Sequence, residues 1–331
     1  MLENKVYTSL SAVLEEPKQV FQLNLSWNDL SSLPTEIEQL TNLVQVDLGY
    51  NKFTSLPVEI KQLTNLTQLT LNGNKLKNLT SGIEQLTNLT QLDLSSNELT
   101  SLPVEIGQLT NLTQLDLSSN KELDWVDTFN KLLLLPNLTQ FNLGSNKLTS
   151  LPVGIGQLTN LTQLDLSSNK ELDWADTFNK LLLLPNLTQL NLSWNELNKL
   201  PIEIGQLTNL TKLDLYDNKL ISLPVEIGQL TNLTKLDLGS NKLISLPVEI
   251  GQLTNLTQLT LGSNKDLDWA DTFNNLLLLP NLTQLDLSWN ELNKLPVEVG
   301  QLTNLTKLDL WGNELNNEAK EEIKHLLEFH P

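Results

Sequence analysis

The amino-acid sequence predicts an α/β solenoid: a curved horseshoe of 13 coils that carries a parallel β-sheet on its concave side. The pattern LxxLxLxxN, with Val or Phe at a few leucine positions, recurs thirteen times along 331 residues. Its closing asparagines are separated nine times by 23 residues and three times by 26. Units of this length cannot bury an apolar side alone, so they stack on their neighbours. The closing asparagines are Asn28, Asn51, Asn74, Asn97, Asn120, Asn146, Asn169, Asn195, Asn218, Asn241, Asn264, Asn290 and Asn313.

Capping helices are expected at both ends, because a solenoid must cover the apolar sides of its end coils. We expect one within residues 1–19 and another within residues 316–331, on either side of the repeat array 20–315. With both ends covered, the chain is expected to be complete and to form one continuous domain. The inward-facing residues are expected to be Leu10, Val13 and Leu14 at the start and Ile323, Leu326 and Leu327 at the end.

Each coil is predicted to contain one short strand. In residues 112–117, Leu115 and Leu117 alternate with Gln114 and Asp116. Alternation with period two gives a strand one buried and one solvated face. The asparagine that follows is expected to point inward and to satisfy backbone groups of its own coil and the next, which is a structural role.

The segment that returns from one strand to the next is too short for a full helix. Leu102, Ile106 and Leu109 recur at a spacing of three to four, which predicts 3₁₀ turns or loose coil on the convex side. The three 26-residue units differ, since Asp124 stands where a helix N-cap belongs, and α-helices of two to three turns are predicted there.

Each longer unit also carries one tryptophan, at Trp125, Trp174 and Trp269. We expect these side chains to pack between the longer helices and their neighbours, because a tryptophan at helical spacing usually belongs to a core. The alternative is an aromatic docking point on the convex side.

Composition excludes several classes of function. The chain has 39 acidic and 21 basic residues, for a net charge of −18, and every base is a lysine. Nucleic acids and anionic membranes are therefore improbable partners, whereas a protein with a basic patch would be attracted. With no cysteine, disulfides, thiolate metal sites and cysteine nucleophiles are excluded. Because the N-terminus lacks the apolar run of a signal peptide, a cytoplasmic and bacterial protein is expected, with the Asn-Leu-Thr triplets as part of the repeat consensus.

The repeat unit LxxLxLxxNxLxxLPxxIxxLTNL resembles the leucine-rich-repeat superfamily, and most closely its 23-residue intracellular type. That type occurs in Ras-binding scaffold proteins, in plant intracellular Ras-group repeat proteins and widely in bacteria. The resemblance covers about residues 20–315, and departs from the pattern at residues 79–83, which lack the proline. It implies protein binding on the concave sheet and no common ligand. Neither the catalytic cysteine of the related bacterial ubiquitin ligases nor the glycine loop of the repeat-linked GTPases occurs here.

Candidate binding residues are the exceptions among otherwise uniform coils. Aromatic residues form three pairs in neighbouring coils, and charged residues lie around the two C-terminal pairs; exposed aromatics beside charges are typical of interface hot spots. The plainer interpretation is that the rings cover gaps at the sheet edge, and at Trp27 and Tyr50 capping competes with binding. The predicted partner-binding residues are Trp194, Tyr216, Asp214, Asp217, Lys212, Trp289, Trp311, Asp286, Asp309 and Lys307.

Neither metal binding nor catalysis is predicted. A column of aspartates occupies one strand position, where neighbouring carboxylates such as Asp93 and Asp116 should raise one another's pKa values. A straight column does not converge on a calcium ion, so a solvated acidic face is expected, with no metal and no cofactor. His325 and His330 lie in the end cap, far in sequence from any residue that could act with them, so we expect no enzyme. The aspartates are Asp93, Asp116, Asp165, Asp214, Asp237, Asp286 and Asp309.

The sequence thus predicts a monomeric, non-catalytic scaffold or adaptor that binds a protein on its concave face. Two alternatives stay open. One is a recognition module for a small GTPase or kinase in signal transduction. The other is a structural or surface-display array without a fixed ligand, which the near-identity of residues 97–146 and 146–195 favours.

Overall fold

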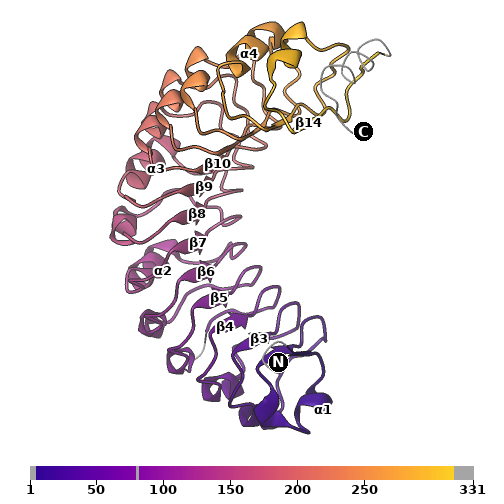
Figure 1. Ribbon diagram of the computed structural model, residues 1–331. Coiled ribbons are helices and arrows are strands. Elements are labelled where there is room, and N and C mark those ends of the chain that lie inside the picture. The colour runs from indigo at the N-terminus through magenta and orange to yellow at the C-terminus, as the bar shows by residue number, and fades with distance from the viewer. Residues whose placement is uncertain (1–4, 80–81, 317–331) are drawn as a thin grey trace. The chain divides into compact units, whose positions relative to one another are not determined.

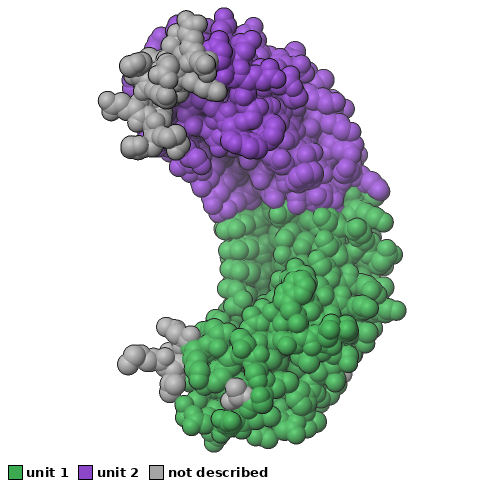
Figure 2. Space-filling view, turned by 90° about the vertical axis from the view of Figure 1, so that its right-hand side faces the viewer, with its two compact units in different colours: residues 1–165 green, residues 166–331 purple. Residues whose placement is uncertain are grey.

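The computed structural model describes residues 5–79 and 82–316, and the chain divides into two compact units, residues 1–165 and 166–331 (Figure 2). Each unit contains a parallel sheet whose strands follow one another in chain order, as the repeat predicts. The single continuous domain stays a prediction.

Over its described residues, the first unit contains eight strands, one more than its repeats account for. The additional strand is β1 (Val6–Tyr7), which pairs in parallel with β2 and covers the first repeat strand. The sequence prediction of 13 strands was therefore short by one, because a two-residue strand has no periodicity to detect. The others are β2 (Gln22–Asn24), β3 (Gln45–Asp47), β4 (Gln68–Thr70), β5 (Gln91–Asp93), β6 (Gln114–Asp116), β7 (Gln140–Asn142) and β8 (Gln163–Asp165).

Up to residue 316, where the described part ends, the second unit contains six strands, each of three residues. They pair without register shift, so equivalent residues of successive coils form straight columns across the sheet. These strands are β9 (Gln189–Asn191), β10 (Lys212–Asp214), β11 (Lys235–Asp237), β12 (Gln258–Thr260), β13 (Gln284–Asp286) and β14 (Lys307–Asp309).

The return segments lie on the side opposite the sheet in each unit and are mostly 3₁₀ turns, as predicted (Figure 1). Where residues 79–83 lack the proline, η4 shortens to three residues and Gly82 precedes it with φ of 122°. In the first unit the turns are η1 (Pro17–Gln19), η2 (Thr35–Gln39), η3 (Val58–Gln62), η4 (Ile83–Gln85), η5 (Val104–Gln108) and η6 (Val153–Gln157). In the second they are η7 (Ile202–Gln206), η8 (Val225–Gln229), η9 (Val248–Gln252) and η10 (Val297–Gln301).

The three 26-residue coils contain the predicted α-helices, α2 (Trp125–Leu132), α3 (Trp174–Leu181) and α4 (Trp269–Leu276). Asp124 caps α2 by accepting hydrogen bonds from the backbone N–H groups of Val126 and Asp127. The first predicted capping helix is shorter than expected. It consists of α1 (Leu10–Val13), which is a single turn, and η1 follows it. The second, within residues 316–331, lies outside the described residues except for Asn316.

Buried asparagines join their coils to the preceding ones, as Asn51 shows. Asn51 donates from Nδ2 to the carbonyl oxygens of Leu25 (2.8 Å) and Leu48 (3.0 Å). Its Oδ1 accepts from the N–H of Leu30 at 2.9 Å. The asparagine has the structural role that we predicted. Its bonds to another coil go to the preceding coil and not to the next one, because the inward side chain points toward the N-terminal side of the stack. Leucines of strands and turns fill the interior, and Leu94 and Leu117 are fully buried.

Candidate binding site

The residue immediately before each buried asparagine has a left-handed backbone. Its φ lies between 50° and 73° in all thirteen coils. Any residue with a Cβ atom pays roughly 1–2 kcal/mol for this conformation, so the position favours glycine, and a bulky side chain there is an outlier. Six coils place serine there, and four place an aromatic residue. In chain order the residues are Trp27, Tyr50, Gly73, Ser96, Ser119, Ser145, Ser168, Trp194, Asp217, Ser240, Ser263, Trp289 and Gly312.

Two aromatic pairs lie on the second unit, where the strands end and the turns begin. Trp194 is 48% exposed, and its ring centroid lies 5.6 Å from that of Tyr216. Trp289 is 51% exposed and lies 4.6 Å from Trp311, with the two rings at 77°. The structure therefore brings each predicted pair together while leaving much of the indoles in solvent. We call these four residues the aromatic edge.

The rings of the aromatic edge also lean on the following coil. A Cβ atom built on Gly312 would lie 2.5 Å from the Trp289 ring, so the ring needs a glycine beneath it. Tyr216 approaches Gly239 in the same way, at 3.0 Å. These two rings cover backbone on one side and meet solvent on the other. They therefore fit both interpretations, in which the rings cover gaps at the sheet edge or bind a partner.

In the first unit, Trp27 and Tyr50 stack face to face, with centroids 4.1 Å apart and ring planes at 9°. Stacking covers one face of each ring, and Trp27 remains 73% exposed. The first pair therefore resembles the aromatic edge in exposure and differs from it in ring geometry, so it serves as a comparison for that site.

The predicted aspartates act on the turns that carry the rings. Asp214 accepts the backbone N–H of Tyr216, and Asp309 accepts that of Trp311, each at 2.9 Å. Asp286 accepts the N–H of Ser288 at 2.8 Å. These carboxylates hold the chain direction just after the strand and so position the aromatic residues.

The remaining predicted residues lie nearby on the second unit. Lys212 and Lys307 begin strands β10 and β14 and are exposed, and Asp217 occupies the left-handed position after Tyr216. They are placed at the sheet surface beside the aromatic edge rather than in contact with it.

The acidic column is less solvated than the sequence suggested. Burial is the largest cause that raises the pKa of Asp116, and the nearby carboxylate of Asp93 adds to the rise. Burial likewise raises the pKa of Asp237 to about 6, with smaller contributions from Asp214 and Asp286. For Asp116 the predicted direction is confirmed, but loss of solvent contributes more than repulsion by Asp93.

A second column of charge follows the buried asparagines, one residue further along. Glu196 lies between Lys170 (2.6 Å) and Lys219 (2.5 Å), and hydrogen bonds from these two lysines lower its pKa to about 2. In the last coils Lys265 forms an ion pair with Glu291, and Glu314 occupies the next position. Sequence reasoning missed this column, although comparison of the residues after successive asparagines would have found it.

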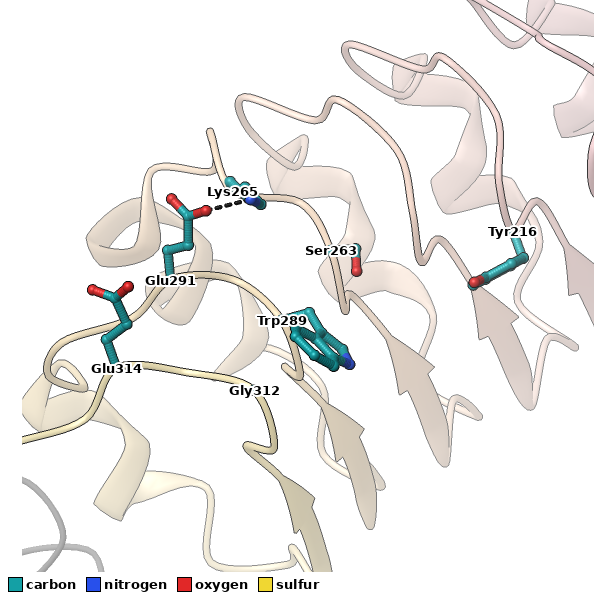
Figure 3. A pocket seen from close by; sticks show the side chains of 7 residues that line it. All are labelled: Tyr216, Ser263, Lys265, Trp289, Glu291, Gly312 and Glu314. Carbon is teal, nitrogen blue, oxygen red and sulfur yellow. Dashed lines mark hydrogen bonds and ion pairs between the residues drawn. The ribbon is translucent and has the colours of Figure 1, made fainter.

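A hollow of about 450 Å³ joins the aromatic edge to this charge column. Figure 3 shows Trp289 between Tyr216 on one side and the charged side chains on the other. The hollow contains two predicted residues and five that were not predicted. Its lining consists of Tyr216, Ser263, Lys265, Trp289, Glu291, Gly312 and Glu314.

The tryptophans of the longer coils lie apart from this site. Trp125 is half-buried, and its ring lies 5.6 Å from that of Phe129 in the same helix. Trp174 and Trp269 have equivalent contacts with Phe178 and Phe273. Packing within α2, α3 and α4 accounts for them.

The site has the chemistry of a binding surface. It offers exposed aromatic faces, carboxylates and small residues. Across residues 5–79 and 82–316, no three His, Asp or Glu side chains gather where they could hold a metal ion. Over the same residues, no helix is long and apolar enough to cross a membrane.

Stacked three-residue strands, return segments that are mostly 3₁₀ turns and buried asparagines in successive coils from Asn51 to Asn290 define the class of leucine-rich-repeat proteins. The family model described as "Leucine-rich repeat region" matches residues 18–124 and 174–329, and a model of two leucine-rich repeats matches 136–180. The chain belongs to the leucine-rich-repeat family.

Several solved structures are similar to this chain. A leucine-rich-repeat protein of Leptospira interrogans is 35% identical, with 98% of each chain covered and a TM-score of 0.72. An internalin of Listeria monocytogenes is 26% identical over 96% of this chain and 89% of its own, with a TM-score of 0.70. A plant peptide hormone receptor, solved in complex with RGF2, is 26% identical over 91% of this chain and 57% of its own, with a TM-score of 0.52. The search among curated proteins gave no match.

Proposed function

We propose that this chain is a non-catalytic scaffold or adaptor that binds a protein partner on the aromatic edge of its second unit. One observation carries the proposal: Trp194 and Trp289 are large, about half-exposed side chains at left-handed positions where six other coils have serine. Because serine satisfies the fold there, the indoles add contact area at a conformational cost. Such residues concentrate at functional sites, and tryptophan is enriched among interface hot spots.

The charge of the chain supports a protein partner with a basic patch. A net charge of −18 attracts such a partner and disfavours nucleic acids and anionic membranes. A structurally similar protein is described as a plant peptide hormone receptor, which is consistent with a polypeptide partner here. A monomer, a cytoplasmic location and a place in signal transduction stay predictions from the sequence.

The test is quantitative capture of proteins from a lysate of the source organism on three immobilised forms of the chain. These are the natural protein, a variant with Trp194→Ser, Tyr216→Ser, Trp289→Ser and Trp311→Ser, and a control with Trp27→Ser and Tyr50→Ser. Serine is used because other coils carry it in this turn, so both variants should keep their circular dichroism spectra. We expect the natural chain and the control to retain one protein in similar amounts. The fourfold variant should retain at least tenfold less of it, because interface hot spots carry most of the binding energy.

Equal retention by all three forms would contradict the proposal. Binding would then use other surfaces, or the chain would be a structural array without a fixed ligand. If the retained protein is a GTPase or kinase, the signalling alternative gains support.

A further inference from the structure

The second unit contains two copies of one local arrangement. In each copy a charged triplet occupies the position after three successive asparagines, and a tryptophan precedes the second of them. The first copy has Lys170, Glu196 and Lys219 with Trp194; the second has Lys265, Glu291 and Glu314 with Trp289. The triplets differ in charge only at the third position, where lysine is replaced by glutamate.

In the first copy the single carboxylate is fully paired within the triplet. Glu196 Oε1 meets the Lys170 ammonium at 2.6 Å, and its Oε2 meets that of Lys219 at 2.5 Å. Both oxygens of this carboxylate therefore have a cation, and no acid of the triplet is left over.

The second copy lacks one cation. Lys265 pairs with Oε1 of Glu291, and Glu314 stands where the first copy has Lys219. Among the described residues the Glu314 carboxylate forms no ion pair. The second triplet therefore has two carboxylates and one lysine. It lies beside a hollow of about 450 Å³ that Trp289 helps to line (Figure 3).

We propose that this hollow binds an arginine side chain of the protein partner, whose guanidinium takes the place of the missing lysine between Glu291 and Glu314. The indole of Trp289 would flank the planar group. Arginine suits the site better than lysine, since its fork bonds two carboxylates, its plane stacks on aromatic rings and it is more weakly hydrated. The inference rests on the proposed function only in that a protein partner supplies the arginine.

The test uses the full chain labelled with ¹⁵N-tryptophan, whose seven indole N–H signals are assigned by single Trp→Phe substitutions. The probes are an acetylated, amidated pentapeptide with one arginine between glycines, and the same peptide with citrulline. Citrulline keeps the shape of arginine and removes its charge. We expect the arginine peptide to shift the Trp289 signal saturably with Kd on the order of 1 mM, and citrulline to leave it unchanged. The Trp27 signal should not move.

Three variants test the charge pattern. Glu291→Gln with Glu314→Gln should raise Kd roughly tenfold, whereas Glu36→Gln with Glu38→Gln, an equal charge change on exposed residues of the first unit, should not. Glu314→Lys restores the pattern of the first copy and should abolish the response at Trp289. Lys219→Glu imposes the pattern of the second copy on the first and should create a new response at Trp194.

Any of four results would overturn the inference: no saturable shift at Trp289, an equal shift with citrulline, a response that survives Glu314→Lys, or no response at Trp194 after Lys219→Glu. These outcomes are separable from those of the capture experiment. Capture through the aromatic edge without an arginine response would contradict this inference alone. An arginine response without a captured protein would contradict the proposed function alone.

Discussion

At the residue scale, the turn after each strand shows which side chains the backbone conformation requires and which ones it does not explain. Every coil requires a left-handed residue before its asparagine, and serine or glycine meets that need. Trp194 and Trp289 meet it less well, and this is the observation behind the proposed binding role. Gly312 shows that the Trp289 ring also packs on the chain itself, because a side chain there would displace the ring.

Asp237 gives a residue-scale prediction about pH. Because burial raises its pKa to about 6 from 3.8, the folded state holds the proton more tightly than the unfolded state. Stability from this group is therefore greatest below pH 4 and is lost as the pH rises toward 6. Asp237→Asn removes that loss, so the variant should gain on the order of 1 kcal/mol at pH 7, after allowance for solvent screening, and almost nothing at pH 4.

The measurement is urea unfolding of both proteins at the two pH values. The fold should tolerate the amide, since Asn191 at the equivalent strand position accepts the N–H of Ser193 at 2.9 Å as Asp237 accepts that of Gly239. An equal gain at both pH values would show that the carboxyl's ionisation is not the cause.

At the scale of the element, the buried asparagine is the residue on which a coil depends most. Asn120 is fully buried, donates to Leu94 O and Leu117 O, and accepts from the N–H of Leu99. Asn120→Ala leaves these backbone groups unpaired and should reduce the free energy of unfolding by about 3 kcal/mol. Urea denaturation followed by circular dichroism measures the change.

A second asparagine of the same coil serves as the control. Asn111 is exposed, and its side chain makes one bond, to Thr87 O at 2.9 Å. Asn111→Ala should cost about 1 kcal/mol or less, since water can replace that bond. If the two substitutions cost the same, burial of the asparagine is not what makes it important.

At the scale of the whole molecule, stability should be local, because a coil packs only on its neighbours. Leu115→Ala removes a buried strand side chain of the first unit and should cost about 2–5 kcal/mol. Hydrogen exchange should show lower protection in strands around β6 and unchanged protection around β12. A uniform loss across both units would contradict this expectation.

The sequence predicted most of the fold and part of the site, for a physical reason. Leucines such as Leu115 and Leu117 repeat because packing is the same in every coil, so periodicity revealed strands, turns and the three α-helices. The aromatic pairs were visible as exceptions to that repeat. The proposed role of Glu314 was not visible in the sequence. It depends on a comparison with Lys219, which occupies the same place in the other copy, and on the hollow between coils. The two-residue strand β1 likewise has no pattern of its own.

The direction of the asparagine bonds bears on how the protein is made. Asn51 completes the coil that contains Leu25 and Leu30, so each coil obtains its last hydrogen bonds from a residue about 23 positions later. On a ribosome that adds about 5–20 residues per second, a newly emerged coil stays incomplete for roughly 1–5 s until the next asparagine appears. During translation, therefore, the youngest coil of the nascent chain has backbone groups that only water satisfies until the next asparagine arrives.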